Sequence, residues 1–323
     1  MVINNMQDFL LLDAQLNSEE RLIQDSIRKF VHEQVIPKMP QAYEQAQFPH
    51  EFIKQCAELG LFGMTLPTEY GGSNASYVAY GLACQELEYG DSSLRSLISV
   101  QNSLCIYPIF KFGTAEQKQY WLPKMVQGDV IGCFGLTEAD SGLDPASMHT
   151  TAIKVAGGWR LNGSKMWITN APIADLAIVW AKTDTGVQGF LIEKSFAGFS
   201  TKTIEHKMSL RASITGEILL ENCMVPDTHH LPGTSIGLVA ALECLTQARY
   251  GIAWGAIGAA MSCYDIAMDY CRIRTQFGKS LTSFQLVQKD LVEMFTEIVK
   301  AQCLNLQIGR LRDAGASNYA MVS

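Results

Sequence analysis

The first 130 residues of the chain have the spacing of apolar positions that is typical of amphipathic helices. Asn17 and Glu20 form a capping-box pattern, and apolar residues follow them at helical intervals through Val31. Glycines and capping residues delimit further helices. These predicted helices cover residues from about 50 to 60, from 77 to about 87 and from 114 to 128, and another begins near residue 93. We therefore expect a helical domain over residues 1–130.

The pattern changes after residue 130 to short runs rich in β-branched and aromatic residues. Glycine and asparagine turns bound these runs, for example at Gly157-Gly158 and Asn162-Gly163. Short strands between such turns are typical of an antiparallel sandwich or barrel. The predicted strands include residues 151–155, 159–161, 166–169, 176–181, 190–192 and 217–220. We expect this β domain to cover residues 131–235.

The helical period returns after Pro226 and Pro232. Two long helices are predicted, over about residues 236–273 and 284–312. They would form a C-terminal helical domain over residues 236–323. The predicted fold class is α+β, with the elements in the order helices, strands, helices.

Composition narrows the possible partners and compartments. Hydrophobic residues make up 48% and charged residues 18%, as in ordinary globular proteins, and the net charge of −7 argues against nucleic acid as a partner. No basic residue precedes Arg21, and the longest uncharged apolar stretch near the C-terminus, residues 250–264, is shorter than the roughly 18 residues that a membrane helix needs. The nine cysteines form no C-x-x-C pair, which indicates reduced thiols and no metal site. A cytoplasmic protein without a membrane segment is expected.

Two short motifs in the β region carry candidate chemistry. The first runs from Phe134 to Glu138, and the second, Lys165 to Asn170, contains Trp167. Each places a threonine hydroxyl at a strand end, and the second adds a large aromatic face. A planar heteroaromatic cofactor needs such groups for its ring faces and polar edges. From the pattern alone, an ordinary core tryptophan with threonines at turns is the favoured interpretation.

The two motifs, in this order and layout, resemble those of the acyl-CoA dehydrogenase family. The segment from Arg272 to Gly278 is similar to the family's R-x-Q-F-G sequence. The resemblance implies FAD as cofactor, electron-transfer flavoprotein as electron acceptor, and a homotetramer in which FAD contacts cross a subunit boundary. By that resemblance the FAD-binding residues would be Phe134, Gly135, Leu136, Thr137, Ser141, Gly142, Trp167, Ile168, Thr169, Arg274, Gln276, Phe277 and Gln285.

Within this family the chain is similar to glutaryl-CoA dehydrogenases, on the stretches 86–88, 95–101 and 248–255. The resemblance implies oxidative decarboxylation of glutaryl-CoA to crotonyl-CoA. Arg95, with Ser99 and Glu88 nearby, would meet the distal carboxylate, Ser96 would line the substrate channel, and Arg249 would orient the acyl end. Residues four apart share a helix face, and an arginine fork suits a carboxylate. Without the resemblance, a solvated polar face is the simpler interpretation.

The sequence departs from the family pattern in two respects. Leu143 occupies a position where glutaryl-CoA dehydrogenases usually carry serine, which removes a hydrogen bond near the CoA thioester. The family's catalytic glutamate lies on a Tyr-Glu-Gly-Thr stretch that does not occur up to Ser323, and Ala248 stands where some relatives place the base. We therefore expect a C-terminally truncated member with no catalytic residue of its own. The alternative function is an inactive remnant that at most binds FAD or acyl-CoA.

Overall fold

The computed structural model describes residues 10–323, so the predicted domain's residues 1–9 lie outside the described part. The chain divides into two compact units. The helical unit comprises residues 10–37, 76–92 and 250–322, and the sheet unit comprises residues 38–75, 93–249 and 323. Each unit is assembled from segments that are distant in sequence. The predicted division into three consecutive domains stays a prediction.

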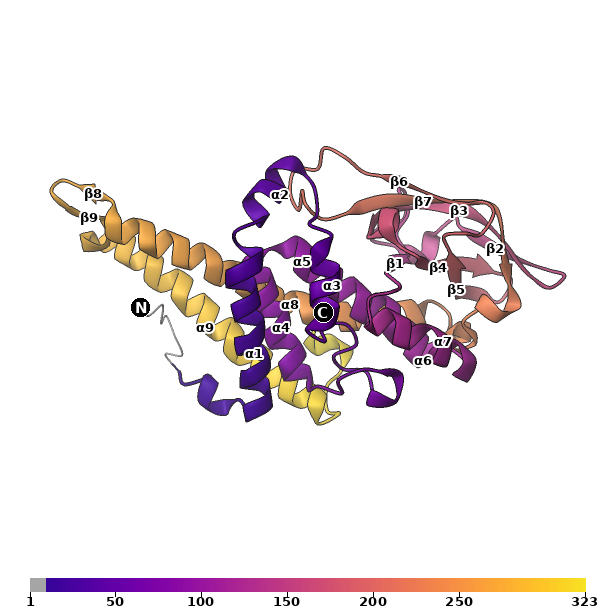
Figure 1. The fold of residues 1–323 in the computed structure, drawn as a ribbon, viewed down its shortest axis with the longest axis horizontal. Helices are drawn as coiled ribbons and strands as arrows, with labels where there is room; N and C mark the ends of the chain where they lie inside the picture. The colour runs from indigo at the N-terminus through magenta and orange to yellow at the C-terminus, as the bar shows by residue number, and fades with distance from the viewer. Residues whose placement is uncertain (1–9) are drawn as a thin grey trace. The chain divides into compact units, whose positions relative to one another are not determined.

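The helical unit consists of long helices joined by a short hairpin (Figure 1). Its elements are α1 (Ser18–Phe30), α4 (Tyr77–Gly90), the part of α8 (Leu238–Ile273) from residue 250 onward, β8 (Thr275–Gln276), β9 (Lys279–Ser280) and α9 (Gln285–Asp313). The capping box at Asn17 is present, because its side chain accepts from the Glu20 amide and the Glu20 carboxylate accepts from the Asn17 amide, both at 2.9 Å.

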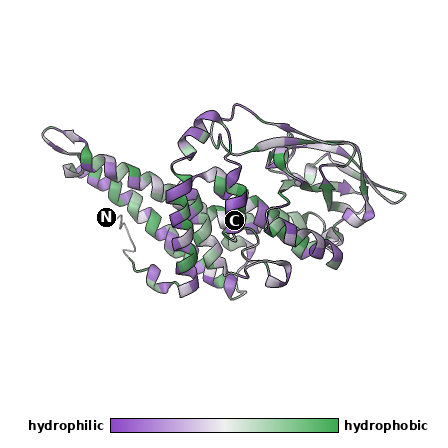
Figure 2. Cartoon of the chain, in the orientation of Figure 1, coloured by the Kyte–Doolittle hydropathy of each residue, from purple (hydrophilic) through white to green (hydrophobic). Residues whose placement is uncertain are grey.

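Close helix packing in this unit depends on glycines at the contact points. A Cβ on Gly258 of α8 would lie 1.9 Å from the carbonyl oxygen of Gln85 on α4. Farther along, Ile257 and Tyr264 of α8 form an apolar cluster with Leu291 and Ile298 of α9. Green and purple bands alternate along both helices in Figure 2, as expected when each helix buries one face.

The sheet unit combines a seven-stranded sheet with shorter helices. Its helices are α2 (Met39–Gln45), α3 (Glu51–Glu58), α5 (Ser92–Ser99), α6 (Tyr107–Phe112), α7 (Ala115–Val126) and the start of α8. Its strands are β1 (Gly132–Gly135), β2 (Thr151–Val155), β3 (Gly158–Thr169), β4 (Leu176–Thr183), β5 (Gly186–Glu193), β6 (Phe199–Thr203) and β7 (Thr215–Pro226). The strand order is β1-β4-β2-β3-β7-β6, with β5 also paired to β4. β4 pairs in parallel with β1 and β2, and the other pairings of this sheet are antiparallel.

The predicted α+β class is confirmed, but one predicted turn is wrong. Asn162-Gly163 does not separate two strands, because β3 continues through it as one strand of 12 residues. The pairing of β3 with β7 shifts register between Leu161 and Gly163, so the glycine marks a bulge. A Cβ on Gly163 would lie within 3 Å of Thr150. Glycine inside a strand pattern is compatible with a turn or with a bulge, and the contacts with neighbouring segments of the same chain decide between the two.

Candidate functional site

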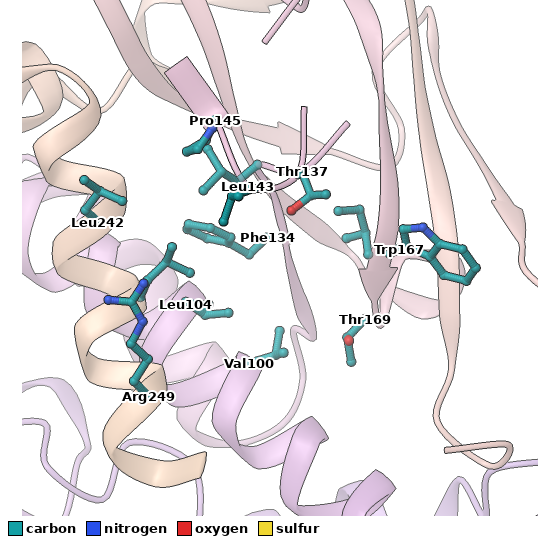
Figure 3. A pocket seen from close by; sticks show the side chains of 14 residues that line it. Val100, Leu104, Phe134, Thr137, Leu143, Pro145, Trp167, Thr169, Leu242 and Arg249 are labelled. Carbon is teal, nitrogen blue, oxygen red and sulfur yellow. The ribbon is translucent and has the colours of Figure 1, made fainter. Parts of the chain in front are cut away.

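A pocket of about 350 Å³ lies in the sheet unit, between the ends of β1 and β3 and the first turns of α8. Figure 3 shows Leu242 and Arg249 projecting from one helix on one side, and Trp167 and Thr169 on the other. The lining residues are Val100, Leu104, Phe134, Leu136, Thr137, Gly142, Leu143, Pro145, Trp167, Ile168, Thr169, Leu242, Leu245 and Arg249. The pocket therefore joins the two sequence motifs to a helix that follows them by more than 70 residues.

The β1 wall of the pocket is fixed by a buried glutamine. Gln101 is fully buried, and its side-chain oxygen accepts from the Gly132 amide at 2.9 Å. Its amide nitrogen donates to the carbonyls of Val130 at 2.8 Å and Met125 at 3.1 Å. These bonds satisfy backbone groups at the start of β1. They therefore fix the position of the strand that carries the pocket residue Phe134.

The β3 wall is formed by a strained bulge. The pairing with β7 shifts register between Lys165 and Ile168, and Trp167 within this segment has a φ of 62°. The bulge leaves the indole 59% exposed beside the pocket rather than packed in the core. Asn170 is buried and has a φ of 68°. Its backbone amide donates to the Ile214 carbonyl at 2.8 Å. Left-handed backbone at non-glycine residues costs energy and clusters at functional sites.

A buried ion pair lies behind these two walls. The Lys165 ammonium donates to the Glu138 carboxylate at 2.8 Å and to the Leu136 carbonyl at 3.1 Å. Glu138 is 6% exposed and Lys165 is 1% exposed. The carboxylate also accepts from the His149 amide at 2.6 Å and the Thr150 amide at 3.0 Å. The pair is thus satisfied by hydrogen bonds on the carboxylate side, as a buried charge requires.

The protonation state of the pair follows from these contacts. Burial by itself raises the pKa of the Glu138 carboxyl, but the hydrogen bonds from Lys165, Thr150 and the backbone outweigh it and lower that pKa to about 2. Burial lowers the pKa of the Lys165 ammonium, and Glu138 opposes that shift. The carboxylate is therefore ionised at neutral pH, and it holds the ammonium as its partner.

The pocket offers the groups that a flavin ring needs. Phe134 and Trp167 provide aromatic surface, and Thr137 and Thr169 provide hydroxyls from two different strand ends. Leu242 and Leu245 make the α8 side apolar, and Leu104 adds apolar surface from the helical segment Val100–Ile106. Arg249 is the one charged residue among the lining residues of this pocket. Such a mixture of apolar surface with a few polar groups is typical of cofactor sites. The residues present therefore fit the isoalloxazine of FAD.

Eight of the predicted site residues line this pocket, and the others do not line it. Those that line the pocket are Phe134, Leu136, Thr137, Gly142, Trp167, Ile168, Thr169 and Arg249. Those in the sheet unit but outside the lining are Gly135, Ser141, Arg95, Ser96 and Ser99. Those in the helical unit are Glu88, Arg274, Gln276, Phe277 and Gln285. The predicted roles of all three sets stay predictions.

Local contacts explain why Gly135 and Ser141 do not line the pocket. A Cβ on Gly135 would face Lys165 at 3.2 Å and Ile218 at 3.3 Å, inside the sheet. The Ser141 hydroxyl lies 2.9 Å from the Ser147 hydroxyl and closes a loop. Both residues therefore lie behind the residues that line the pocket.

Arg95 and Ser99 are buried, which contradicts the solvated-face interpretation. Arg95 is 8% exposed and Ser99 is 3% exposed, and both lie on α5. A buried guanidinium needs anionic or polar partners.

Sequence reasoning missed the apolar lining residues Val100, Leu104, Leu242 and Leu245, although their helical spacing of three or four was available as a signal.

Three family models match the chain in order. They are the acyl-CoA dehydrogenase N-terminal domain over residues 17–129, the middle domain over residues 133–223 and the C-terminal domain over residues 236–323. The chain belongs to the acyl-CoA dehydrogenase family, whose members are FAD-dependent oxidoreductases.

Individual relatives agree with the family and differ in their substrates. A glutaryl-CoA dehydrogenase structure from Mycobacterium smegmatis is 47% identical, with a TM-score of 0.95 over 98% of this chain and 81% of that one. A second, in complex with FADH2, is 43% identical, with a TM-score of 0.94 over 96% and 80%. The mitochondrial 2-methylacyl-CoA dehydrogenase of Solanum tuberosum is 34% identical over 97% of this chain and 78% of its own length.

Residues 10–323 contain neither a membrane-spanning helix nor a cluster of metal ligands. No helix in this range is long and apolar enough to cross a membrane. No group of three or more His, Cys, Asp or Glu side chains in it could hold a metal ion.

Proposed function

We propose that this chain is an acyl-CoA dehydrogenase that binds a flavin and acts on glutaryl-CoA. The observation that carries the proposal is the pocket itself, in which Thr137 and Thr169 on two strand ends face an apolar helix that bears Arg249. The similarity to glutaryl-CoA dehydrogenase supports the choice of substrate. The overall reaction would be oxidation and decarboxylation to crotonyl-CoA, with electrons passed to electron-transfer flavoprotein.

The ring of FAD would lie against the two strand ends. Phe134, Leu136, Thr137, Trp167, Ile168 and Thr169 would hold it, with apolar contacts to its faces and hydroxyls at its polar edges. FAD, when bound, supplies the acceptor for the hydride that leaves the substrate β-carbon. The exposed residues Arg274, Gln276, Phe277 and Gln285 would hold the rest of FAD bound to a second copy. By the family resemblance, the expected assembly is a homotetramer.

The substrate's distal carboxylate would be bound by Arg95. Its guanidinium is buried on α5, one helical turn before Ser99, and Ser99 directly precedes the pocket residue Val100. A buried arginine selects a dicarboxylate because it binds both oxygens and cannot lose its proton. Ser96 would line the substrate channel, and Glu88 would lie near the same carboxylate. Arg249 would orient the acyl end of the substrate.

One observation favours a second candidate function, which is binding without oxidation. None of the 14 pocket-lining residues, all within the described part of the chain, is an aspartate or glutamate. Removal of the substrate α-proton requires a positioned base. The second candidate is therefore a protein that binds FAD and acyl-CoA and leaves both unchanged.

An anaerobic titration distinguishes these functions. The purified chain is loaded with FAD, and glutaryl-CoA or butyryl-CoA is added while flavin absorbance is recorded. Bleaching by glutaryl-CoA supports the oxidation, and a shifted spectrum without bleaching supports binding alone. An unchanged spectrum with bound FAD refutes an acyl-CoA site.

Arg95→Gln tests the carboxylate role, with the exposed Arg160→Gln as the matched control. Loss of one partner of a buried charged contact costs about 2 kcal/mol or more, so glutaryl-CoA should bind at least roughly thirtyfold more weakly. Butyryl-CoA binding should be unchanged. Equal weakening for both ligands would contradict the assignment.

A further inference from the structure

We propose that Glu138 and Lys165 are positioning residues that hold three walls of the pocket in the geometry that binds the flavin. The inference rests on the proposed function, because it assigns the pocket to FAD. Neither side chain lines the pocket, so the pair would act through the backbone and loops that it contacts.

The first two walls are joined through Lys165. This residue belongs to β3, two positions before Trp167, and its ammonium donates to the carbonyl of Leu136 at the end of β1. The next residue, Met166, donates its amide to the Thr137 carbonyl at 2.9 Å. The backbone around Leu136 and Thr137 is therefore held against the bulge that presents Trp167.

The third wall is held through Glu138. The loop from residue 138 to residue 150 contributes Gly142, Leu143 and Pro145 to the pocket. Glu138 opens this loop, and its carboxylate accepts from the amides of His149 and Thr150, which end the loop. One carboxylate thus fixes both ends of the loop and the ammonium that reaches β1.

Stability alone does not account for a pair in this position. A buried ion pair is costly to desolvate, and replacing both partners with apolar groups of similar size is often neutral or stabilising. What such groups supply is a defined arrangement, because each charge accepts few alternative partners. Here the arrangement that is defined is that of Leu136, Thr137 and Trp167, all of which line the pocket.

The test compares FAD affinity with stability in the ligand-free chain. Glu138→Gln, Lys165→Met and the double variant are compared with Leu161→Ala, a core substitution on the same strand that lies outside the pocket. Dissociation constants for FAD are measured by calorimetry, thermal midpoints by circular dichroism, and amide exchange by mass spectrometry.

Each single variant should bind FAD at least tenfold more weakly and exchange faster in residues 134–150 and 165–170. The double variant should bind FAD no more weakly than the single variant with the lower FAD affinity, because both substitutions disturb the same arrangement. Leu161→Ala should lower the thermal midpoint while keeping FAD affinity within twofold. If a single variant does not fold, Thr150→Val, which removes the hydroxyl bonds to the Glu138 carboxylate and the Ser164 carbonyl, should show the same selective loss of affinity.

Two results would overturn the inference. Folded single variants that keep the FAD affinity of the unmodified chain would show that the pair does not position the site. An equal loss of affinity in Leu161→Ala would show a merely structural role. If the unmodified chain binds no FAD, the proposed function fails first, which separates the two failures.

Discussion

Replacing Glu138 with glutamine should destabilise the ligand-free sheet unit in a way that depends on pH. The folded state lowers the pKa of this carboxyl from 4.5 to about 2, so the ionised form is favoured by folding. That difference corresponds to about 3 kcal/mol of stability at neutral pH. Since Lys165 also loses its partner, we expect Glu138→Gln to cost about 3 to 5 kcal/mol at pH 7.

The sign of the pH dependence follows from the lowered pKa. The contribution of Glu138 is complete above pH 4.5 and is lost as the pH falls toward 2, because the unfolded chain takes up the proton first. Between pH 7 and pH 3.5 the difference in unfolding free energy between the unmodified chain and Glu138→Gln should shrink by about 1 to 1.5 kcal/mol.

Urea unfolding followed by tryptophan fluorescence measures this difference. Four of the five tryptophans lie in the sheet unit, so the signal reports on that unit. The exposed Glu221→Gln on β7 is the matched control and should change stability by less than about 0.5 kcal/mol. A difference between Glu138→Gln and the unmodified chain that stays constant down to pH 3.5, or is below 1 kcal/mol at pH 7, would refute the reasoning.

Three other substitutions test the packing, capping and ring-binding interpretations. Gly258→Ala should destabilise the helical unit by about 3 kcal/mol in thermal unfolding, because its Cβ would meet the Gln85 carbonyl, whereas Gly142→Ala, with nothing within 4 Å, should leave stability unchanged. Asn17→Ala should cost about 1 kcal/mol by loss of the α1 cap, and no change in urea midpoint would contradict that role. Trp167→Leu should weaken FAD binding by about 1 kcal/mol, roughly fivefold, in the same calorimetric assay, and unaltered affinity would argue against ring contact.

Much of the fold could be predicted from local signals. The capping box at Asn17, the helix from Tyr77 and the two long C-terminal helices follow from spacing and end signals within one turn of each boundary. The motifs around Thr137 and Trp167 lie at one pocket, as predicted, but the family resemblance and not the residue types alone assigned them to a cofactor.

The tertiary structure decided what depends on contacts between distant segments. Gly163 became a bulge rather than a turn because Thr150 lies against it, and Trp167 was turned beside the pocket by a register shift that no period reveals. The Glu138–Lys165 pair joins residues 27 positions apart, and its burial changes both pKa values only once the two strands meet. Residue types and their spacing determined which chemistry the chain carries. The fold decided which of those groups share one pocket, because desolvation and hydrogen-bond geometry exist only after the segments pack.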